Sequence, residues 1–215
     1  YQAAPSVGAV VRGTLELLPE VLVVDDGSSD ATAEAARRAG ARVVSFPCNR
    51  GKGAALATAF QDLFGRGFDG VITLDADGQH LPEEIPKLLQ VAEKGEDLVL
   101  GVRDHLFAEM GALRRASNRL SSKAISFAAG QRLSDIQTGF RFYSRRLVET
   151  VGFPETRFEA ESAVVVRAAR RGFRVITVPV RLGFADGRTN SHYRPLIDSL
   201  RIAGAVTRAR FERGR

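Results

Sequence analysis

The sequence has a single cysteine, Cys48, so no disulfide can form within the chain, and we expect a reducing, cytoplasmic setting. It has no run of about 18 uncharged apolar residues, the length that predicts a membrane-spanning helix. The first ten residues, YQAAPSVGAV, have neither a basic start nor a long apolar run, so they do not predict a secretion signal. The sequence also contains no repeat, no low-complexity segment and no linker.

What is present is typical of one globular domain. The chain has 215 residues, of which 44% are hydrophobic and 26% charged, enough to bury a core. The formal net charge is +6, and six arginines lie between Tyr193 and Arg215. We predict a domain over residues 1–194 and a basic amphipathic helix over residues 195–215. That helix could be solvated, pack on the domain or on a second copy in a homodimer, or lie on an anionic membrane surface. No nucleic-acid partner is expected.

Strand-like and helix-like segments alternate along the chain. Short apolar or β-branched runs predict strands at residues 20–26, 41–46, 70–77, 96–103, 139–144 and 173–182. Helical patterns cover residues 30–40, 52–67, 81–95, 112–129, 159–171 and 195–213. This alternation predicts an α/β fold with a mainly parallel central sheet and helices on both faces. In such sheets, ligands bind at the carboxyl ends of the strands.

Acidic residues follow two of the predicted strands. Asp25 and Asp26 end the first apolar run, and Asp75 and Asp77 end the run VITLDAD. Alternate residues that leave a strand tip can turn two carboxylates toward one point. Hard oxygen ligands of this kind suit Mg²⁺ or Mn²⁺, which keep positions open for phosphate oxygens. The second tip therefore predicts a metal site for a diphosphate.

Other interpretations of the stretch DADGQH are weaker. A calcium loop would need Gly at its sixth position and Glu at its twelfth, where His80 and Pro86 stand. A haloacid-dehalogenase-like phosphohydrolase would use Asp75 as its nucleophile, but it expects Thr or Ser where Gln79 stands. That phosphohydrolase and an inactive nucleotide-binding module remain alternatives.

Five segments together resemble a known family. VLVVDDGSSDAT, NRGKGAALATAF, LDADGQHLPEEIPKLL, LGVR and SDIQTGFRFYSR occur in the order and spacing of family 2 glycosyltransferases with the GT-A fold. The resemblance covers nearly all of residues 1–182 and is greatest to the dolichyl- or polyprenyl-phosphate mannosyltransferase-like branch. It implies a single-domain, Rossmann-like enzyme that moves a sugar from a GDP- or UDP-sugar to a polyprenyl phosphate, with inversion. Mg²⁺ or Mn²⁺ would neutralise the diphosphate leaving group.

The resemblance also implies roles for individual residues. His80 would support the turn, and Arg188 would close over the diphosphate. The metal ligands would be Asp75, Asp77 and Gln79. The nucleotide sugar would be bound by Asp25, Asp26, Lys52, Asp75, Ala76, Asp77 and Arg188.

The acceptor decides the remaining roles. A sugar or lipid hydroxyl needs a general base, for which Asp135 is the candidate. A polyprenyl phosphate is already largely ionised at neutral pH, so Arg103 and Arg119 would instead bind its oxygens. Glu159 and Glu161 flank the expected cleft without an assigned role. Both acceptor classes remain open, and the enzyme is expected at the cytoplasmic face of a membrane as a peripheral protein.

The sequence departs from the family pattern at two places. The family begins with an apolar strand, whereas this chain opens with YQAAPSVG and has Ala3 where the family has Glu. We therefore expect the first strand to be missing from the sequence as given. In the late loop GRTNSHYRP, His192 takes the place of a lysine, so no role is assigned to it.

Overall fold

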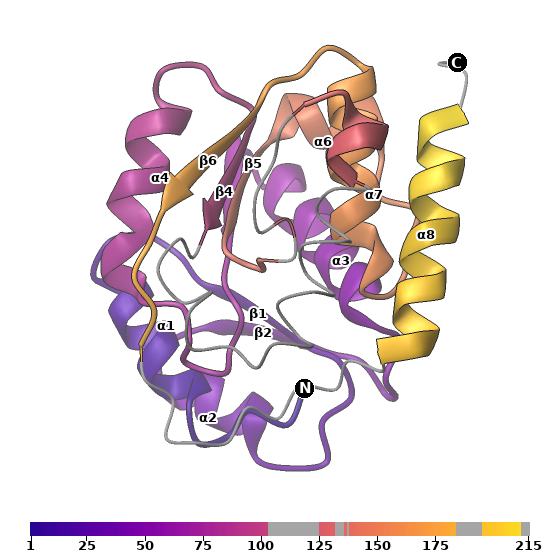
Figure 1. Cartoon of the computed structure of the whole chain (residues 1–215). Coiled ribbons are helices and arrows are strands. Elements are labelled where there is room, and N and C mark those ends of the chain that lie inside the picture. The colour runs from indigo at the N-terminus through magenta and orange to yellow at the C-terminus, as the bar shows by residue number, and fades with distance from the viewer. Residues whose placement is uncertain (103–124, 132–135, 137, 184–194, 212–215) are drawn as a thin grey trace.

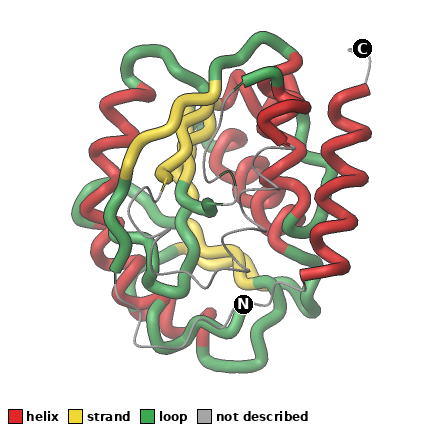
Figure 2. Tube along the Cα trace, in the orientation of Figure 1, coloured by secondary structure: helices red, strands yellow, loops and turns green. Residues whose placement is uncertain are grey.

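The computed structural model describes residues 1–102, 125–131, 136, 138–183 and 195–211. Within these residues the strands form two sheets with helices on both sides (Figures 1 and 2). In Figure 1, α1 (Val7–Leu15) and α4 (Ile85–Ala92) lie on one side, and α3 (Lys52–Gly65) and α7 (Glu159–Arg170) lie on the other. The arrangement agrees with the predicted α/β class.

A small parallel sheet carries the first acidic tip. Its strands are β1 (Leu22–Asp25) and β2 (Arg42–Ser45), joined by α2 (Thr32–Arg38). Because a parallel pair needs a crossover, the helix between the two strands is the connection that the sequence predicts. Asp25 and Asp26 therefore lie at the carboxyl end of β1.

The second sheet is mixed. It has four strands in the order β3 (Gly70–Thr73), β5 (Arg141–Ser144), β4 (Leu98–Val102) and β6 (Val175–Pro179). β4 and β6 pair in parallel, whereas β5 runs antiparallel to both β3 and β4. β3, β4 and β6 therefore run in one direction, as expected for a mainly parallel sheet, and β5 is the one exception among the described strands.

The reason lies in where β5 begins. Arg141, its first residue, pairs with Thr73, the last residue of β3. The chain enters β5 from the carboxyl edge of the sheet and must run back across it. A parallel strand would have required a crossover to the opposite edge before β5.

Helix α7 forms the centre of the larger hydrophobic core. Every residue from Ala160 to Ala168 is buried, because α3 lies on one side of α7 and α8 (Pro195–Phe211) covers another (Figure 1). The buried residues of α8 recur at intervals of three and four, which places them on one face. They are Ile202, Ala205, Val206 and Ala209.

The described part of α8 thus packs on the domain. Membrane contact by its other face and pairing with a second copy stay predictions. Among the residues that the structure describes, no helix has the length and apolar character needed to cross a membrane.

The N-terminal segment joins the tips of the two sheets. The backbone N–H of Ala3 donates to Thr32 Oγ1 at 2.8 Å, and Ser6 Oγ donates to the Ala76 carbonyl at 2.6 Å. Within the described residues β1 and β3 are not hydrogen-bonded to each other. The expected missing first strand stays a prediction.

Two helices were not predicted. α1 follows Ser6 directly, and α6 (Arg145–Val151) follows β5 without a loop. Ser144 caps α6, because its Oγ accepts from the Leu147 backbone N–H at 3.0 Å. The same Oγ donates to Asp97 Oδ1 at 2.6 Å.

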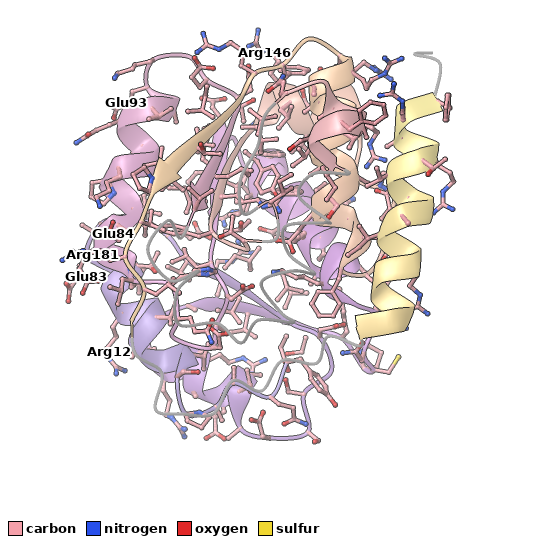
Figure 3. All side chains as sticks on the ribbon, in the orientation of Figure 1. Arg12, Glu83, Glu84, Glu93, Arg146 and Arg181 are labelled. Carbon is pink, nitrogen blue, oxygen red and sulfur yellow. The ribbon has the colours of Figure 1, made fainter. Side chains whose placement is uncertain are left out.

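A buried carboxylate fastens the end of β6 to the turn before α4. Glu84, in the 3-10 turn η1 (Pro82–Glu84), is 0% exposed and accepts from Arg181 Nε at 2.6 Å (Figure 3). The Lys87 ammonium also contacts Glu84 Oε2. Burial opposes the charged form, but the hydrogen bonds from Lys87 and Arg181 outweigh it and hold the pKa of Glu84 below its usual value.

We predict that Glu84→Gln lowers the free energy of unfolding by about 1–3 kcal/mol at neutral pH, because it removes two charge-assisted contacts. The pKa of Glu84 is depressed by folding, so its stabilising effect is present above its unfolded-state pKa and is lost as pH falls through the folded-state pKa. Urea unfolding of both proteins between neutral pH and about pH 3 measures the difference, which should shrink in acid.

The exposed neighbour Glu83 provides the matched control. Glu83→Gln makes the same chemical change one residue away and should leave the unfolding free energy within about 0.5 kcal/mol. A constant difference between Glu84→Gln and the unchanged protein at all pH values would contradict the assignment.

Candidate functional site

The second acidic tip is held against the strand beside it. β3 ends at Thr73, earlier than predicted, and Thr73 Oγ1 donates to the Gly139 carbonyl at 2.8 Å. A Cβ atom at Gly139 would lie 2.4 Å from Asp75 Oδ2 and 2.5 Å from Oδ1. Only glycine allows the backbone before β5 to approach the Asp75 carboxylate so closely.

The turn after Asp75 is fixed by its own polar groups. The Asp75 backbone N–H donates to His80 Nδ1 at 3.1 Å, and His80 is 4% exposed beside the Phe140 ring. Asp77 Oδ1 accepts from the Gln79 backbone N–H at 2.9 Å, which leaves the exposed Asp77 side chain at the outside of the turn. His80 supports the turn, as expected.

Lys52 reaches the same tip from the first turn of α3. Its Nζ lies 2.7 Å from Asp75 Oδ1 and 3.1 Å from Glu161 Oε2 of α7. Burial disfavours the charged ammonium, but Asp75 and then Glu161 outweigh this effect, so the pKa of Lys52 lies above its usual value. Lys52 therefore stays positively charged at neutral pH and lies between two carboxylates.

The loop before α3 is positioned by the first acidic tip. The backbone N–H groups of Arg50 and Gly51 donate to the two oxygens of Asp26 at 2.6 and 2.9 Å. Gly53 packs so tightly that a Cβ there would lie 2.2 Å from the Glu155 carbonyl oxygen. Asp26 and the small residue next to Lys52 together set where the ammonium stands.

Asp25 serves the turn that follows β1. Its Oδ1 accepts from the Ser28 backbone N–H at 3.2 Å and from the Ser28 hydroxyl. Both aspartates of the first tip are buried, Asp25 at 4% and Asp26 at 7% exposure. The structure links Asp26 to the loop that carries Lys52, and Lys52 to Asp75, whereas the side-chain oxygen Oδ1 of Asp25 bonds to Ser28 of its own turn.

A buried arginine completes the cluster, and the sequence analysis missed it. Arg141 is 0% exposed, and its guanidinium donates to the carbonyls of Thr138 at 2.7 Å, Ile136 at 2.5 Å and Glu161 at 2.7 Å. Its Nε also lies 3.9 Å from Glu161 Oε1. The one available signal was an arginine inside the apolar strand segment GFRFYS.

The donor set at the second tip suits a hard divalent cation whose coordination is completed by substrate. Within the described part of the chain, no three His, Cys, Asp or Glu side chains are close enough to hold a metal ion by themselves. The tip offers two carboxylates, Asp75 and Asp77, and the Gln79 amide follows two residues later. Oxygen ligands in an open set are typical of Mg²⁺ and Mn²⁺ sites that bind phosphates.

Four predicted site residues lie outside the described residues. They are Arg103, Arg119, Asp135 and Arg188; His192, to which no role was assigned, also lies outside them. Glu159 is described and stands in the first turn of α7, where its Oε2 is buried without a hydrogen-bond partner among the described groups. The structure therefore brings together Asp26, Lys52, Asp75 and Glu161. The roles of Arg103, Arg119, Arg188 and Asp135 stay predictions.

We predict that Gly139→Ala disturbs Asp75 directly, because the added methyl group would overlap its carboxylate. It should weaken Mn²⁺ binding and lower the free energy of unfolding by about 1–3 kcal/mol. Electron paramagnetic resonance of free Mn²⁺ and thermal unfolding measure the two effects.

The control is Gly65→Ala at the end of α3, where an added Cβ would meet nothing within 4 Å. That variant should leave Mn²⁺ binding unchanged and should not lower the free energy of unfolding, because alanine favours the helical conformation over glycine. Equal Mn²⁺ binding by the Gly139 variant and the unchanged protein would show that the Asp75 carboxylate need not lie against Gly139.

Known proteins share both sequence and fold with this chain. A sequence profile described as "Glycosyl transferase family 2" matches residues 1–152. Glycosyltransferase AglJ of Haloferax volcanii is 36% identical over 185 residues, which cover 83% of this chain and 59% of that protein. Undecaprenyl-phosphate 4-deoxy-4-formamido-L-arabinose transferase of Yersinia enterocolitica is 38% identical over 138 residues, 61% of this chain and 41% of that protein. The chain thus spans about three fifths and two fifths of their respective lengths.

Solved structures show the same fold at low sequence identity. Glucosyl-3-phosphoglycerate synthase from Mycobacterium tuberculosis, in complex with Mn²⁺, UDP-glucose and phosphoglyceric acid, has a TM-score of 0.71 at 20% identity, over 96% of this chain and 76% of that one. A mycobacterial protein has a TM-score of 0.72 at 24% identity, over 96% and 71%. These likenesses confirm the predicted GT-A fold.

Proposed function

Because the chain belongs to glycosyl transferase family 2, we propose that it transfers a sugar from a nucleotide-diphosphate sugar to a polyprenyl phosphate, with a divalent metal ion at Asp75 and Asp77. The observation that carries the proposal is the carboxylate of Asp75, held between Gly139 and the Lys52 ammonium at the tip of β3. The name of the Yersinia relative, a transferase of undecaprenyl phosphate, supports the acceptor class.

On the donor side, Asp75 and Asp77 would hold Mg²⁺ or Mn²⁺ with Gln79 as a third ligand. The bound metal supplies Lewis-acid neutralisation of the diphosphate leaving group. Lys52 stands beside Asp75 with an ammonium that can donate to a phosphate oxygen. The backbone of Ala76 lies in the turn between the two carboxylates, and Arg188, outside the described residues, would close over the diphosphate.

The first acidic tip serves the rest of the nucleotide. Asp25 and Asp26 lie toward the base and ribose, and Asp26 at the same time fixes the loop before Lys52. GDP and UDP are the two donor nucleotides in the proposal. The Mycobacterium structure contains UDP-glucose with Mn²⁺, which supports a divalent metal as the partner of the nucleotide.

On the acceptor side, Arg103 and Arg119 bind the phosphate of a polyprenyl phosphate, whose oxygen attacks the sugar opposite the diphosphate. A single in-line displacement inverts the anomeric centre and needs no covalent intermediate. The phosphate oxygen is already ionised at neutral pH, so no general base is needed. Peripheral contact with the lipid surface is part of the proposal, through the exposed Arg201 and Arg208 of α8.

The decisive experiment is product analysis after incubation with GDP- and UDP-sugars, undecaprenyl phosphate and either Mn²⁺ or EDTA. The expected product is a lipid-phosphate sugar that forms only with metal. Release of phosphate from p-nitrophenyl phosphate would instead support a phosphohydrolase, and no product from any donor would support a binding module.

We predict that Asp77→Asn keeps the fold, because the Asp77 side chain is exposed, and weakens Mn²⁺-dependent nucleotide binding roughly ten- to a hundred-fold. Calorimetric titration with UDP and GDP, with Mn²⁺ and with EDTA, measures the loss. Asp69→Asn is the control, since Asp69 is fully exposed at the opposite end of β3. Equal nucleotide affinity with Mn²⁺ and EDTA in the unchanged protein would rule out the metal assignment.

Two further variants separate the acceptor classes. With a phosphate acceptor, we predict that Arg103→Ala lowers transfer far more than it lowers nucleotide affinity, and that Asp135→Asn is tolerated. The reverse pattern would indicate a hydroxyl acceptor with Asp135 as the general base. The two acceptor classes are distinguished by measuring transfer rates to undecaprenyl phosphate and to acceptors with a sugar or lipid hydroxyl, together with nucleotide affinity.

A further inference from the structure

The Lys52 ammonium lies close enough to the proposed metal site to affect the binding of a metal ion there. Its Nζ lies 2.7 Å from Asp75 Oδ1, within hydrogen-bond distance of a carboxylate that would be a metal ligand. The same ammonium lies 3.1 Å from Glu161 Oε2. A divalent ion at Asp75 would therefore enter beside a positive charge that already interacts with its ligand.

The partner on the other side of Lys52 cannot move away easily. Glu161 is 5% exposed in the buried helix α7, and its carboxylate lies 3.9 Å from Arg141 Nε. Arg141 is itself fixed by three carbonyl oxygens, including that of Glu161. The buried pair thus holds a carboxylate at a constant place, and Lys52 is anchored to it.

Asp75 is restrained as well. The Gly139 backbone lies so close to the two carboxylate oxygens of Asp75 that a methyl group on Gly139 would overlap them. Gly139 restricts the Asp75 carboxylate on one side and Glu161 is buried, so the member of the group with the longest flexible side chain is Lys52, which is 23% exposed. Arg141, Lys52, Glu161 and Asp75 sum to zero charge, and with Asp77, the other proposed ligand, the net charge is −1, so a bound divalent ion would leave the site at +1.

We infer that Lys52, anchored by the Glu161–Arg141 pair, makes the metal site selective for a metal ion that arrives together with a diphosphate. Without nucleotide, the ammonium competes with the metal ion for Asp75 and repels it. With nucleotide, the negative diphosphate offers Lys52 a new partner, and the same charge then favours binding. This inference rests on the proposed function, because it assumes the metal site at Asp75.

The test is Lys52→Met, which keeps a long unbranched side chain, one atom shorter than lysine, and removes the charge. The variant should bind Mn²⁺ alone roughly three- to ten-fold more tightly, and Mn²⁺ with UDP or GDP more weakly by a similar factor. Free Mn²⁺ is measured by electron paramagnetic resonance on the intact chain, with and without nucleotide. Opposite signs in the two conditions distinguish a charge effect from simple damage to the site, which would weaken both.

Two further variants complete the design. Lys94→Met removes the same charge at an exposed position of the chain and should change neither affinity. Glu161→Gln leaves Lys52 with Asp75 as its remaining carboxylate and should weaken binding of Mn²⁺ alone, the direction opposite to Lys52→Met. Thermal unfolding shows which variants are folded, and a failure of Glu161→Gln to fold leaves the Lys52→Met comparison intact.

The outcomes separate the two levels of the proposal. No uptake of Mn²⁺ by the unchanged protein, even with nucleotide, overturns the metal site itself. Nucleotide-dependent uptake by the unchanged protein, with Lys52→Met unaltered or weaker for Mn²⁺ alone, overturns the role of Lys52 and leaves the proposed function in place.

Discussion

The site depends on one buried charge, the guanidinium of Arg141. An arginine without exposure needs an acceptor for its donors and a negative charge nearby, and the structure supplies three carbonyls and Glu161. Glu161 in turn attracts Lys52, and Lys52 attracts Asp75. The chain of charges runs from the centre of the core to the tip of β3, so the packing of β5 against α7 determines where the proposed metal ligand lies.

Close backbone approach sets the distances within this chain of charges. Gly53 lets the first turn of α3 touch the segment before α7, and Gly139 lets the strand beside β3 touch Asp75. At both positions a Cβ would lie closer than 2.5 Å to an oxygen atom. Polar residues supply the reactive groups of the site, but the two glycines allow the close backbone contacts that set the distances between those groups.

The sequence predicts the elements better than it predicts their pairing. Alternating apolar runs and helical patterns locate β1, α3 and α7, and the two aspartates after an apolar run locate the tip of β3. The order of apolar runs and helical segments does not indicate the direction in which a strand runs, so the antiparallel direction of β5 was not predicted. Arg141 was missed because its hydrogen-bond partners are backbone carbonyls, which no pattern of side chains in the sequence indicates. α1 contains Gly8 and Gly13, and α6 has seven residues, so neither gives a strong helical signal.

The apolar face of the C-terminal helix α8 packs on the domain, and this limits how the helix can contact a membrane. Ile202, Ala205, Val206 and Ala209 are buried on the domain, which is why α7 is buried on every side. That face is no longer available to insert into lipid. A membrane contact by the described part of α8 must use its other sides, where Arg201 and Arg208 flank the buried face and Phe211 is exposed. The arginine part of such a contact is electrostatic, so it depends on anionic lipid and weakens with salt over the Debye length.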